Sequence, residues 1–302
     1  YLRQKMTEMG FLEIQTPILC ASSPEGARDY IVPSRKYKGK FYALPQAPQQ
    51  YKQLLMVSGF DKYFQIAPCF RDEDARADRS PGEFYQLDFE MSFAIQEDVF
   101  RAGEEVLTAT FNKFAPEGAS VTQAPFPIIS YKQAMLEFGC DKPDLRNPLR
   151  IMDVTEFFQK CTFKPFLKRT VRAIRVHAEM SKGFHEKLLS FAQSIGMGGL
   201  GYLEIADDMS YKGPIDKFIP DEYKAELADI AGLVPGDTIF FIADKEERAN
   251  LYAGQLRNEL GKRLDLYEKN AFRFCFVNDF PMFEYDNEEK KKIGRASCRE
   301  RV

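Results

Sequence analysis

The chain has 302 residues, of which 44% are hydrophobic and 29% are charged, and its net charge at pH 7 is −3. These proportions are those of a globular protein of about two domains, which excludes disordered, collagen-like and coiled-coil classes. No apolar run has the length of a membrane span, the six cysteines form no close pair, and the only histidines are His177 and His185, so we expect a cytoplasmic protein without a zinc module or a disulfide scaffold.

The first part of the chain is predicted to form helices and strands of one domain. A helix that Gly10 closes precedes strand-like stretches at 11–18 and 40–44, and a further helix is expected at 49–58. A longer helix is predicted over 97–114. The side chains spaced to face the core in that helix are Phe100, Leu107, Phe111 and Phe114.

Residues 63–71 and 84–93 are predicted to form two strands joined by a highly charged loop. Side chains alternate between the two faces of a strand, so the second strand has one acidic and one apolar face. If the polar faces of both strands coincide, one surface of an antiparallel sheet carries Arg71, Gln86, Asp88 and Glu90. Taken alone, this alternation favours an ordinary half-solvated sheet with surface ion pairs.

Strands and helices alternate from Thr170 to Leu264, which predicts a second α+β domain. The expected strands are 171–176, 201–206 and 238–243, and the expected helices are 186–195, 221–231 and a segment from Lys245 onward. An aromatic-rich strand at 271–284 then returns to the first domain, so the second domain is predicted to be an insertion.

Three short patterns indicate no site. Gly196 to Gly201 matches GxGxxG, but it follows a helix and enters a strand, which is the reverse of a dinucleotide fingerprint, and we interpret it as a loop. Asp72 to Arg76 begins like a calcium loop but lacks its turn glycine. His185 precedes a glutamate with no second histidine nearby and is predicted to be solvated.

Cys69 and Cys161 are predicted to be buried small hydrophobic residues.

Neither end has the features of a natural terminus. Residues 1–6 lack an initiator methionine and begin within a helix, so we expect a truncation at the start. Residues 293–302 resemble the translation of a sequencing-library adapter and are predicted to be non-native.

The strand–loop–strand segment reads Phe-Arg-Asp-Glu-Asp-Ala-Arg-Ala-Asp-Arg over 70–79 and Glu-Phe-Tyr-Gln-Leu-Asp-Phe-Glu over 83–90. These two stretches of sequence resemble motif 2 of class II aminoacyl-tRNA synthetases in its bacterial aspartyl form. Four further stretches resemble other segments of the same family. They are 11–17 (motif 1), 23–30 (the flipping loop), 41–54 (the aspartate-recognition segment) and 279–284 (the re-entry into the catalytic domain).

The resemblance implies an α+β fold in which a class II antiparallel-sheet catalytic domain is interrupted by an inserted domain. The implied catalytic domain covers 1–141 and resumes at 269–292, and the GAD-like α+β insertion covers 142–268. The implied activity is that of an aspartate-tRNA ligase, which uses ATP and Mg²⁺ to convert L-aspartate to aspartyl-adenylate and transfers it to the 3′ end of tRNA(Asp). Whether tRNA(Asn) is also charged stays open. A homodimer through motif 1, without membrane contact, is implied.

The resemblance also implies roles for individual residues. Arg71 is the implied catalytic residue, because its planar donors suit the α-phosphate and the substrate carboxylate. Lys52, with Gln49, is the implied selector of aspartate over asparagine. The implied ATP-binding residues are Arg71, Asp72 and Glu73, and the implied aspartate-binding residues are Glu25, Gln49, Lys52, Arg71 and Asp88.

Two assignments rank below these. Arg76 and Arg79 are implied to contact the tRNA acceptor end, with a solvated charge cluster as an equal alternative. Glu90 is implied to help hold a metal or to order the pocket, although no complete ligand set accompanies it.

Two departures from the family pattern leave alternatives open. Ser80 stands where many members have a glutamine, so the ATP contact of that amide does not carry over. The sequence also stops before motif 3, so the fragment itself is expected to have little or no activity. The alternatives are an asparagine- or lysine-specific enzyme and a non-catalytic tRNA-binding or regulatory paralogue.

Overall fold

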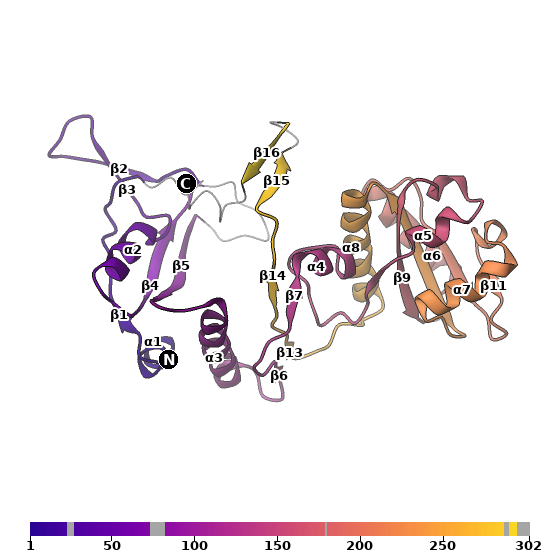
Figure 1. Ribbon diagram of the computed structural model, residues 1–302, viewed down its shortest axis with the longest axis horizontal. Coiled ribbons are helices and arrows are strands. Elements are labelled where there is room, and N and C mark those ends of the chain that lie inside the picture. The colour runs from indigo at the N-terminus through magenta and orange to yellow at the C-terminus, as the bar shows by residue number, and fades with distance from the viewer. Residues whose placement is uncertain (23–26, 73–81, 179, 287–289, 295–302) are drawn as a thin grey trace. The chain divides into compact units, whose positions relative to one another are not determined.

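The structure, a computed structural model, describes residues 1–22, 27–72, 82–178, 180–286 and 290–294, and Figure 1 shows their helices and strands. The chain forms two units. The first comprises 1–115, 123–125 and 281 onward, and the second comprises 116–122 and 126–280. Among the described residues, no helix combines the length and the apolar character that crossing a bilayer requires.

The first unit is built on a three-stranded sheet in the order β1-β4-β5. Strand β1 runs parallel to β4, and β4 runs antiparallel to β5. The helices of this unit are α1 (Leu2–Glu8), α2 (Gln49–Val57) and α3 (Gln96–Phe114). Its strands are β1 (Leu12–Glu13), β2 (Ile31–Pro33), β3 (Phe41–Ala43), β4 (Lys62–Phe70), β5 (Glu83–Met91), β15 (Phe283–Asp286) and β16 (Lys291–Gly294).

The core of the first unit lies between this sheet and two helices. Met6 of α1, Phe11, Phe64 of β4, and Ala102 and Val106 of α3 form one buried cluster. Helix α1 ends before Gly10, whose φ of +83° is a conformation that glycine adopts without strain. The helix and the two long strands predicted from sequence are therefore confirmed.

The predicted core face of α3 is wrong for two of its four residues, while Phe100 and Phe111 are half-buried. The structure buries Ala102 and Val106, whereas Phe114 is 64% exposed and Leu107 is 37% exposed. Apolar residues occupy two sides of this helix, and contact with α1 and the sheet selects the side with the smaller residues, which allows close approach.

The second unit contains a five-stranded antiparallel sheet in the order β11-β10-β12-β9-β8. Its strands are β6 (Ser120–Val121), β7 (Ile128–Ser130), β8 (Ile151–Asp153), β9 (Thr170–His177), β10 (Gly201–Ile205), β11 (Tyr211–Lys212), β12 (Asp237–Asp244), β13 (Ala271–Phe272) and β14 (Phe276–Asn278). Its helices are α4 (Tyr131–Glu137), α5 (Thr155–Gln159), η1 (Lys164–Phe166), α6 (Lys182–Ser194), η2 (Asp216–Phe218), α7 (Asp221–Ala231) and α8 (Glu246–Arg263).

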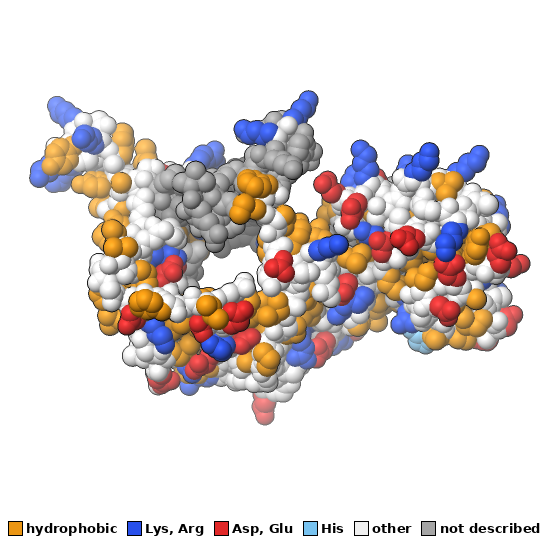
Figure 2. All heavy atoms as spheres, viewed as in Figure 1, with side chains coloured by type: hydrophobic (Ala, Val, Ile, Leu, Met, Phe, Trp, Pro, Cys, Tyr) orange, Lys and Arg blue, Asp and Glu red, His pale blue; other side chains and the backbone are white. Residues whose placement is uncertain are grey.

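Helices cover both faces of this sheet. In β12, Ile239 and Phe241 join a cluster with residues of α5 and α7, while Phe240 and Ile242 join one with residues of α6 and α8. A strand buried on both faces is apolar at every position, which explains the run at 239–242. Figure 2 shows charges of both signs intermingled on the visible surface of this unit.

His185 is buried, contrary to the prediction of a solvated helix start. Its ring stacks on Tyr202 at 4.1 Å between centroids, and its Nε2 lies 2.8 Å from Glu204 Oε1. Helix α6 begins four residues earlier than the sequence pattern suggested, with Ser181 as its N-cap, and this start places His185 against the sheet. Cys69 and Cys161 are buried, as predicted.

The returning strand pairs with a segment that precedes the predicted insertion. Strands β13 and β14 run parallel to β6 and β7, respectively, so 271–278 lies beside 120–130. The two compact units, however, divide near residues 115, 126 and 280. All four of these strands therefore belong to the second unit. The domain boundaries at 142, 268 and 292, and the foreign origin of 293–302, stay predictions.

Candidate active site

The strands β4 and β5 present one polar face that lies opposite the core of the first unit. Their register pairs Gln65 with Asp88 and Tyr63 with Glu90. The residues of this face, called here the β4–β5 face, are Tyr63, Gln65, Ala67 and Cys69 of β4 and Phe84, Gln86, Asp88 and Glu90 of β5. The two polar faces inferred from the alternating sequence therefore coincide.

Lys52 reaches this face from helix α2. Its Nζ lies 2.9 Å from Asp88 Oδ1 and 3.0 Å from Glu90 Oε1. The side chains of Lys52 and Asp88 are 13% and 12% exposed, so the pair is largely withdrawn from water. Burial lowers the pKa of Lys52, but the Asp88 and Glu90 carboxylates outweigh it, and the pKa is raised overall. The site therefore keeps a charged ammonium beside two carboxylates.

Two polar atoms beside Lys52 are left without partners. Within the described part of the chain, the Tyr63 hydroxyl and Asp88 Oδ2 are both buried and have no hydrogen-bond partner of normal geometry, although Asp88 lies near enough to raise the pKa of Tyr63. Burial, and after it the nearby Asp88 carboxylate, raises the pKa of Tyr63, so the phenol stays protonated. Buried polar groups normally have partners, so an unpaired carboxylate oxygen marks a place where a ligand cation can bind.

Arg71 follows β4 directly, and most of its guanidinium donors have no partner among the described residues. Its guanidinium lies over the Phe84 ring at 5.1 Å, and its Nε donates to the Gln46 carbonyl oxygen over 3.4 Å. It forms no ion pair with any residue that the structure describes. The backbone N–H of Arg71 donates to the Gly82 carbonyl, which fixes where the side chain leaves the strand. A partly buried guanidinium with unfilled donors suits a planar anion.

The Gln46 side chain forms hydrogen bonds with the backbone of the segment that follows residue 26. Only 1% of this residue is exposed; its Nε2 donates to Ala27 O over 2.9 Å, and its Oε1 accepts the Ala27 N–H over 3.2 Å. Beside it, Arg28 forms a bridge with Asp72, with 3.7 Å between Arg28 Nε and Asp72 Oδ2. The ends of two loops are thereby held next to Arg71.

The structure brings some of the predicted site residues together. Lys52, Asp88 and Glu90 are in contact; Asp72 pairs with Arg28; and Gln49 begins α2, half-buried, one helical turn before Lys52. The predictions for Glu25, Glu73, Arg76 and Arg79 lie outside the described residues. No group of three His, Cys, Asp or Glu residues that could hold a metal occurs in the described ranges, so the metal role of Glu90 stays a prediction.

Sequence reasoning missed several residues of this region. Gln46 and Tyr63 lay inside segments that were singled out, but only their burial and contacts reveal them. A more visible signal was the turn between β2 and β3. The exposed cations of this turn are Arg35, Lys36, Lys38 and Lys40, and Figure 2 shows basic side chains gathered at the tip of the hairpin.

The arrangement can hold a small ligand of mixed charge. The ammonium of Lys52 and the guanidinium of Arg71 suit negative groups, and the unpaired oxygen of Asp88 suits a positive one. The backbone around them is ordered by a sheet and a helix, so little reorganisation is needed when the ligand binds.

Comparison with known proteins places this chain in a family. The model of "tRNA synthetases class II (D, K and N)" matches residues 1–300. The chain is 57% identical over 296 residues to the aspartate-tRNA(Asp/Asn) ligase of Ehrlichia chaffeensis, covering 96% of this chain and 50% of that protein. It is 54% identical over 300 residues to the ligase of the same name from Rickettsia bellii, covering 97% and 49%.

The chain spans about half the length of the curated relatives it matches. Among solved structures, asparaginyl-tRNA synthetase from Pyrococcus horikoshii complexed with asparaginyl-adenylate aligns with a TM-score of 0.39 and 18% identity, covering 85% of this chain and 63% of that one.

Proposed function

The chain belongs to the class II tRNA synthetases of the D, K and N type, and from this premise we propose that it is part of an aspartate-tRNA ligase. The proposed reaction joins L-aspartate to the α-phosphate of ATP, releases pyrophosphate and transfers the aspartyl group to the 3′ end of tRNA(Asp). The relatives at 54 to 57% identity carry the name aspartate-tRNA(Asp/Asn) ligase, which favours tRNA(Asn) as a second substrate. No observation favours a non-catalytic paralogue.

The observation that carries this proposal is the Lys52–Asp88–Glu90 cluster on the β4–β5 face, at whose far end the Arg71 guanidinium lies over Phe84. We propose that the side-chain carboxylate of aspartate binds Lys52, with Gln49 beside it. The ligand's ammonium then binds Asp88, whose Oδ2 is unpaired, and Glu25. A buried cation rejects asparagine, because the neutral amide leaves the charge of Lys52 uncompensated.

Arg71 is the proposed catalytic residue. Its fork holds the reacting carboxylate and the α-phosphate, and it stabilises the charge that develops on the phosphoryl oxygens. The contact with the Phe84 ring, at 5.1 Å, limits the motion of the guanidinium. Asp72 and Glu73 are proposed to lie beside the ATP.

Magnesium is proposed to arrive with ATP. The described residues offer no carboxylate cluster for a resident ion, and Mg²⁺ commonly binds through substrate phosphates with few protein ligands. The ion neutralises phosphate charge when bound.

For tRNA, we propose contacts from Arg76 and Arg79 and from the basic turn between β2 and β3. Each lysine that binds a tRNA phosphate displaces a counterion, so the affinity falls as salt is added. Lys36→Ala and Lys38→Ala should each reduce the slope of log affinity against log salt by about one. An unchanged slope would remove this turn from the interface.

A homodimer through residues 11–17 is also proposed, in a cytoplasmic enzyme. Leu12 and the nearby Leu19 are each 52% exposed within this chain, and exposed apolar side chains of this kind mark protein interfaces.

The test is ATP–pyrophosphate exchange by the whole protein that contains this chain. We expect exchange with L-aspartate and none above background with L-asparagine. Lys52→Met should abolish the discrimination between the two, while Lys62→Met, a lysine whose Nζ donates to the Met9 carbonyl on the core side of β4, should keep it. Exchange that responds to asparagine or lysine in the wild type would overturn the proposal.

A further inference from the structure

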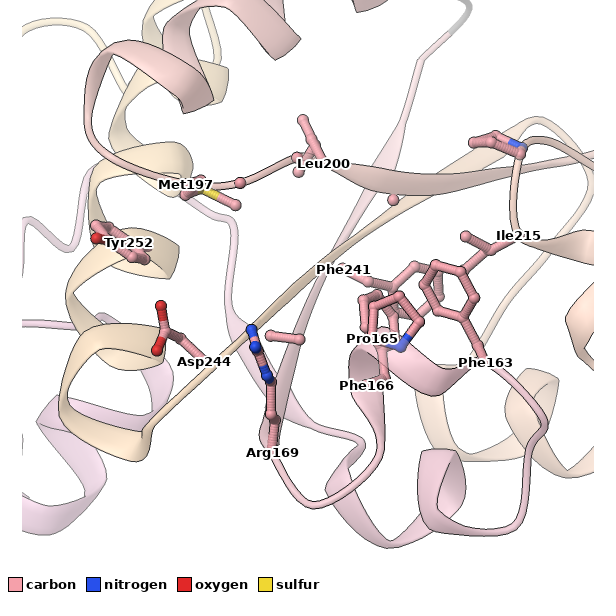
Figure 3. Close-up of a pocket in the computed structure, with 15 residues that line it drawn as sticks. Phe163, Pro165, Phe166, Arg169, Met197, Leu200, Ile215, Phe241, Asp244 and Tyr252 are labelled. Atoms are coloured by element: carbon pink, nitrogen blue, oxygen red, sulfur yellow. The ribbon is translucent and has the colours of Figure 1, made fainter.

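The second unit contains a cavity that the proposed reaction does not use. Its volume is about 470 Å³, within the range of small-molecule sites. It lies between η1, the loop that joins α6 to β10, and the ends of β12 and α8. Figure 3 shows the residues that line it.

One part of the cavity is an aromatic floor. Phe163 and Phe166 meet edge to face at 4.7 Å, and Phe241 and Ile215 complete the floor. Gly201 keeps this floor open, because a Cβ there would lie 3.3 Å from Phe166 Cζ and 3.4 Å from Ile215 Cγ2. Phe166 and Phe241 are only 6% and 1% exposed, so the half-buried Phe163 offers the ring on which a flat ligand ring can stack.

The opposite part is polar and rich in donors. Arg169 is exposed and forms no ion pair within the described ranges. In the view of Figure 3 its side chain lies between the Asp244 carboxylate and the ring cluster. The backbone N–H groups of Gly198 and Gly199 form no hydrogen bond with the described residues, and a Cβ on either glycine would meet no atom within 4 Å. Consecutive amides without partners attract an anion, and so does a guanidinium that lines the same cavity.

Asp244 supplies the acceptor at the cavity's edge. Its Oδ1 accepts the Lys245 N–H over 2.7 Å, and its Oδ2 lies 3.5 Å from Arg248 Nε. Each carboxylate oxygen has a further lone pair, so Asp244 can accept a hydrogen bond from a hydroxyl group. Arg248 offsets its charge, which lessens the repulsion of an anion bound nearby.

We propose that this cavity binds a nucleoside monophosphate unit. The base stacks on Phe163 of the aromatic floor, the phosphate binds Arg169 and the amides of Gly198 and Gly199, and the ribose 2′-hydroxyl donates to Asp244. The unit is either a free mononucleotide or one residue of a single RNA strand. The 196–201 loop thus binds phosphate without the strand-to-helix order of a dinucleotide fold, since it leads from α6 into β10.

The test uses the full chain with its methionine methyl groups labelled for NMR. Met197 lines the cavity, while Met56 lies in the first unit, so binding at the two places is distinguished. We expect adenosine monophosphate to shift the Met197 methyl signal. Loss of ATP-site function in the first unit would leave this shift unchanged, which separates the inference from the proposed function. If AMP leaves the Met197 signal in place, the inference is wrong.

Variants assign the contacts. Arg169→Ala should weaken AMP binding about tenfold and adenosine binding less than about twofold. Gly201→Val, which fills the floor, should weaken both. Lys182→Ala removes a charge whose side chain is 92% exposed, outside the cavity, and should weaken neither. Equal binding of AMP by Arg169→Ala and wild type would overturn the phosphate assignment.

Two further ligands complete the test. Deoxyadenosine monophosphate should bind more weakly than AMP, and equal binding would remove Asp244 from the site. A single-stranded tetra-adenylate distinguishes the sources. Tighter binding than AMP, with the same Met197 shift, supports an RNA strand, and weaker binding supports a free nucleotide.

Discussion

Arg71 in the first unit is partly buried and Arg257 in the second is fully buried, and the two guanidinium groups differ in how many of their donors have partners. Arg257 is 1% exposed and donates to the carbonyls of Leu149, Asn147 and Asp144 over 2.7, 2.8 and 2.9 Å. Arg71 has one long bond to a carbonyl and no ion pair among the described residues. A buried cation whose donors are filled by its own chain stabilises the fold, whereas unfilled donors are available to a ligand.

The same contrast applies to acceptors. In the second unit, the buried carboxylate of Asp237 accepts from Val234 N–H over 2.9 Å and lies 2.9 Å from His177 Nδ1. In the first unit, Asp88 Oδ2 is buried without a partner. Of these two carboxylates, Asp237 is satisfied by its own chain, whereas Asp88 keeps one oxygen for something that binds. The following predictions test this difference.

The largest expected effect is that of Arg71→Ala on catalysis. We expect the aspartate-dependent exchange rate of the whole protein to fall about thousandfold, because a positioned donor to the developing charge is lost. The free energy of unfolding of the chain should change by less than about 0.5 kcal/mol, since no internal partner is stranded. A large loss of stability in urea denaturation would show that Arg71 is structural.

Arg257→Ala should act in the opposite way. We expect a loss of about 3 kcal/mol in the free energy of unfolding, because three buried carbonyl groups lose their donor and a cavity remains. Arg263→Ala on the same helix is the control. Arg263 pairs with Glu259 one turn earlier, at 2.7 Å, and its removal should cost only about 0.5 kcal/mol. Equal losses for the two variants would contradict the comparison.

Lys52 combines features of both regions, and its contribution should depend on pH. Its pKa in the folded chain is raised above the usual 10.5. The stabilising contribution of the ammonium is therefore fully present below pH 10.5 and is lost as the pH rises through the higher, folded value. The difference in unfolding free energy between wild type and Lys52→Met should shrink above about pH 10.5. A difference that grows with pH would reverse the assigned sign.

The smallest expected effect is that of Tyr63→Phe. The hydroxyl has no partner, so its removal should change the unfolding free energy by less than about 0.5 kcal/mol. Tyr211→Phe is the matched control in the second unit, because the Tyr211 hydroxyl donates to the Lys224 carbonyl over 2.7 Å. That variant should cost about 1 kcal/mol. A larger loss of unfolding free energy for Tyr63→Phe than for Tyr211→Phe would show that the Tyr63 hydroxyl has a hydrogen-bond partner.

Much of the local structure could be predicted because its signals are local. The alternation over 83–91 identified the polar face of β5, and the punctuation by Gly10 identified the end of α1. Helix α7 was predicted with its observed ends at Asp221 and Ala231, where Gly232 adopts a φ of +58° and ends it. Each of these features depends on a few adjacent residues.

The failures have a common cause. The core side of α3 and the burial of His185 depend on which neighbour each helix meets, and that neighbour is far along the chain. Val106 packs with Met6, and His185 contacts Glu204 and Tyr202. Periodicity shows that a helix has an apolar side, but it does not choose between two such sides.

The sequence by itself determined the α+β class, the order of the main elements and the polar or apolar character of each strand face, because these follow from side-chain spacing along one segment. Only the tertiary structure decided the register that sets Gln65 opposite Asp88, and the approach of Lys52 to Asp88 and Glu90 from another element. It also decided which polar atoms have partners. Distances between side chains 36 residues apart, such as Lys52 and Asp88, arise from packing, which no local pattern encodes.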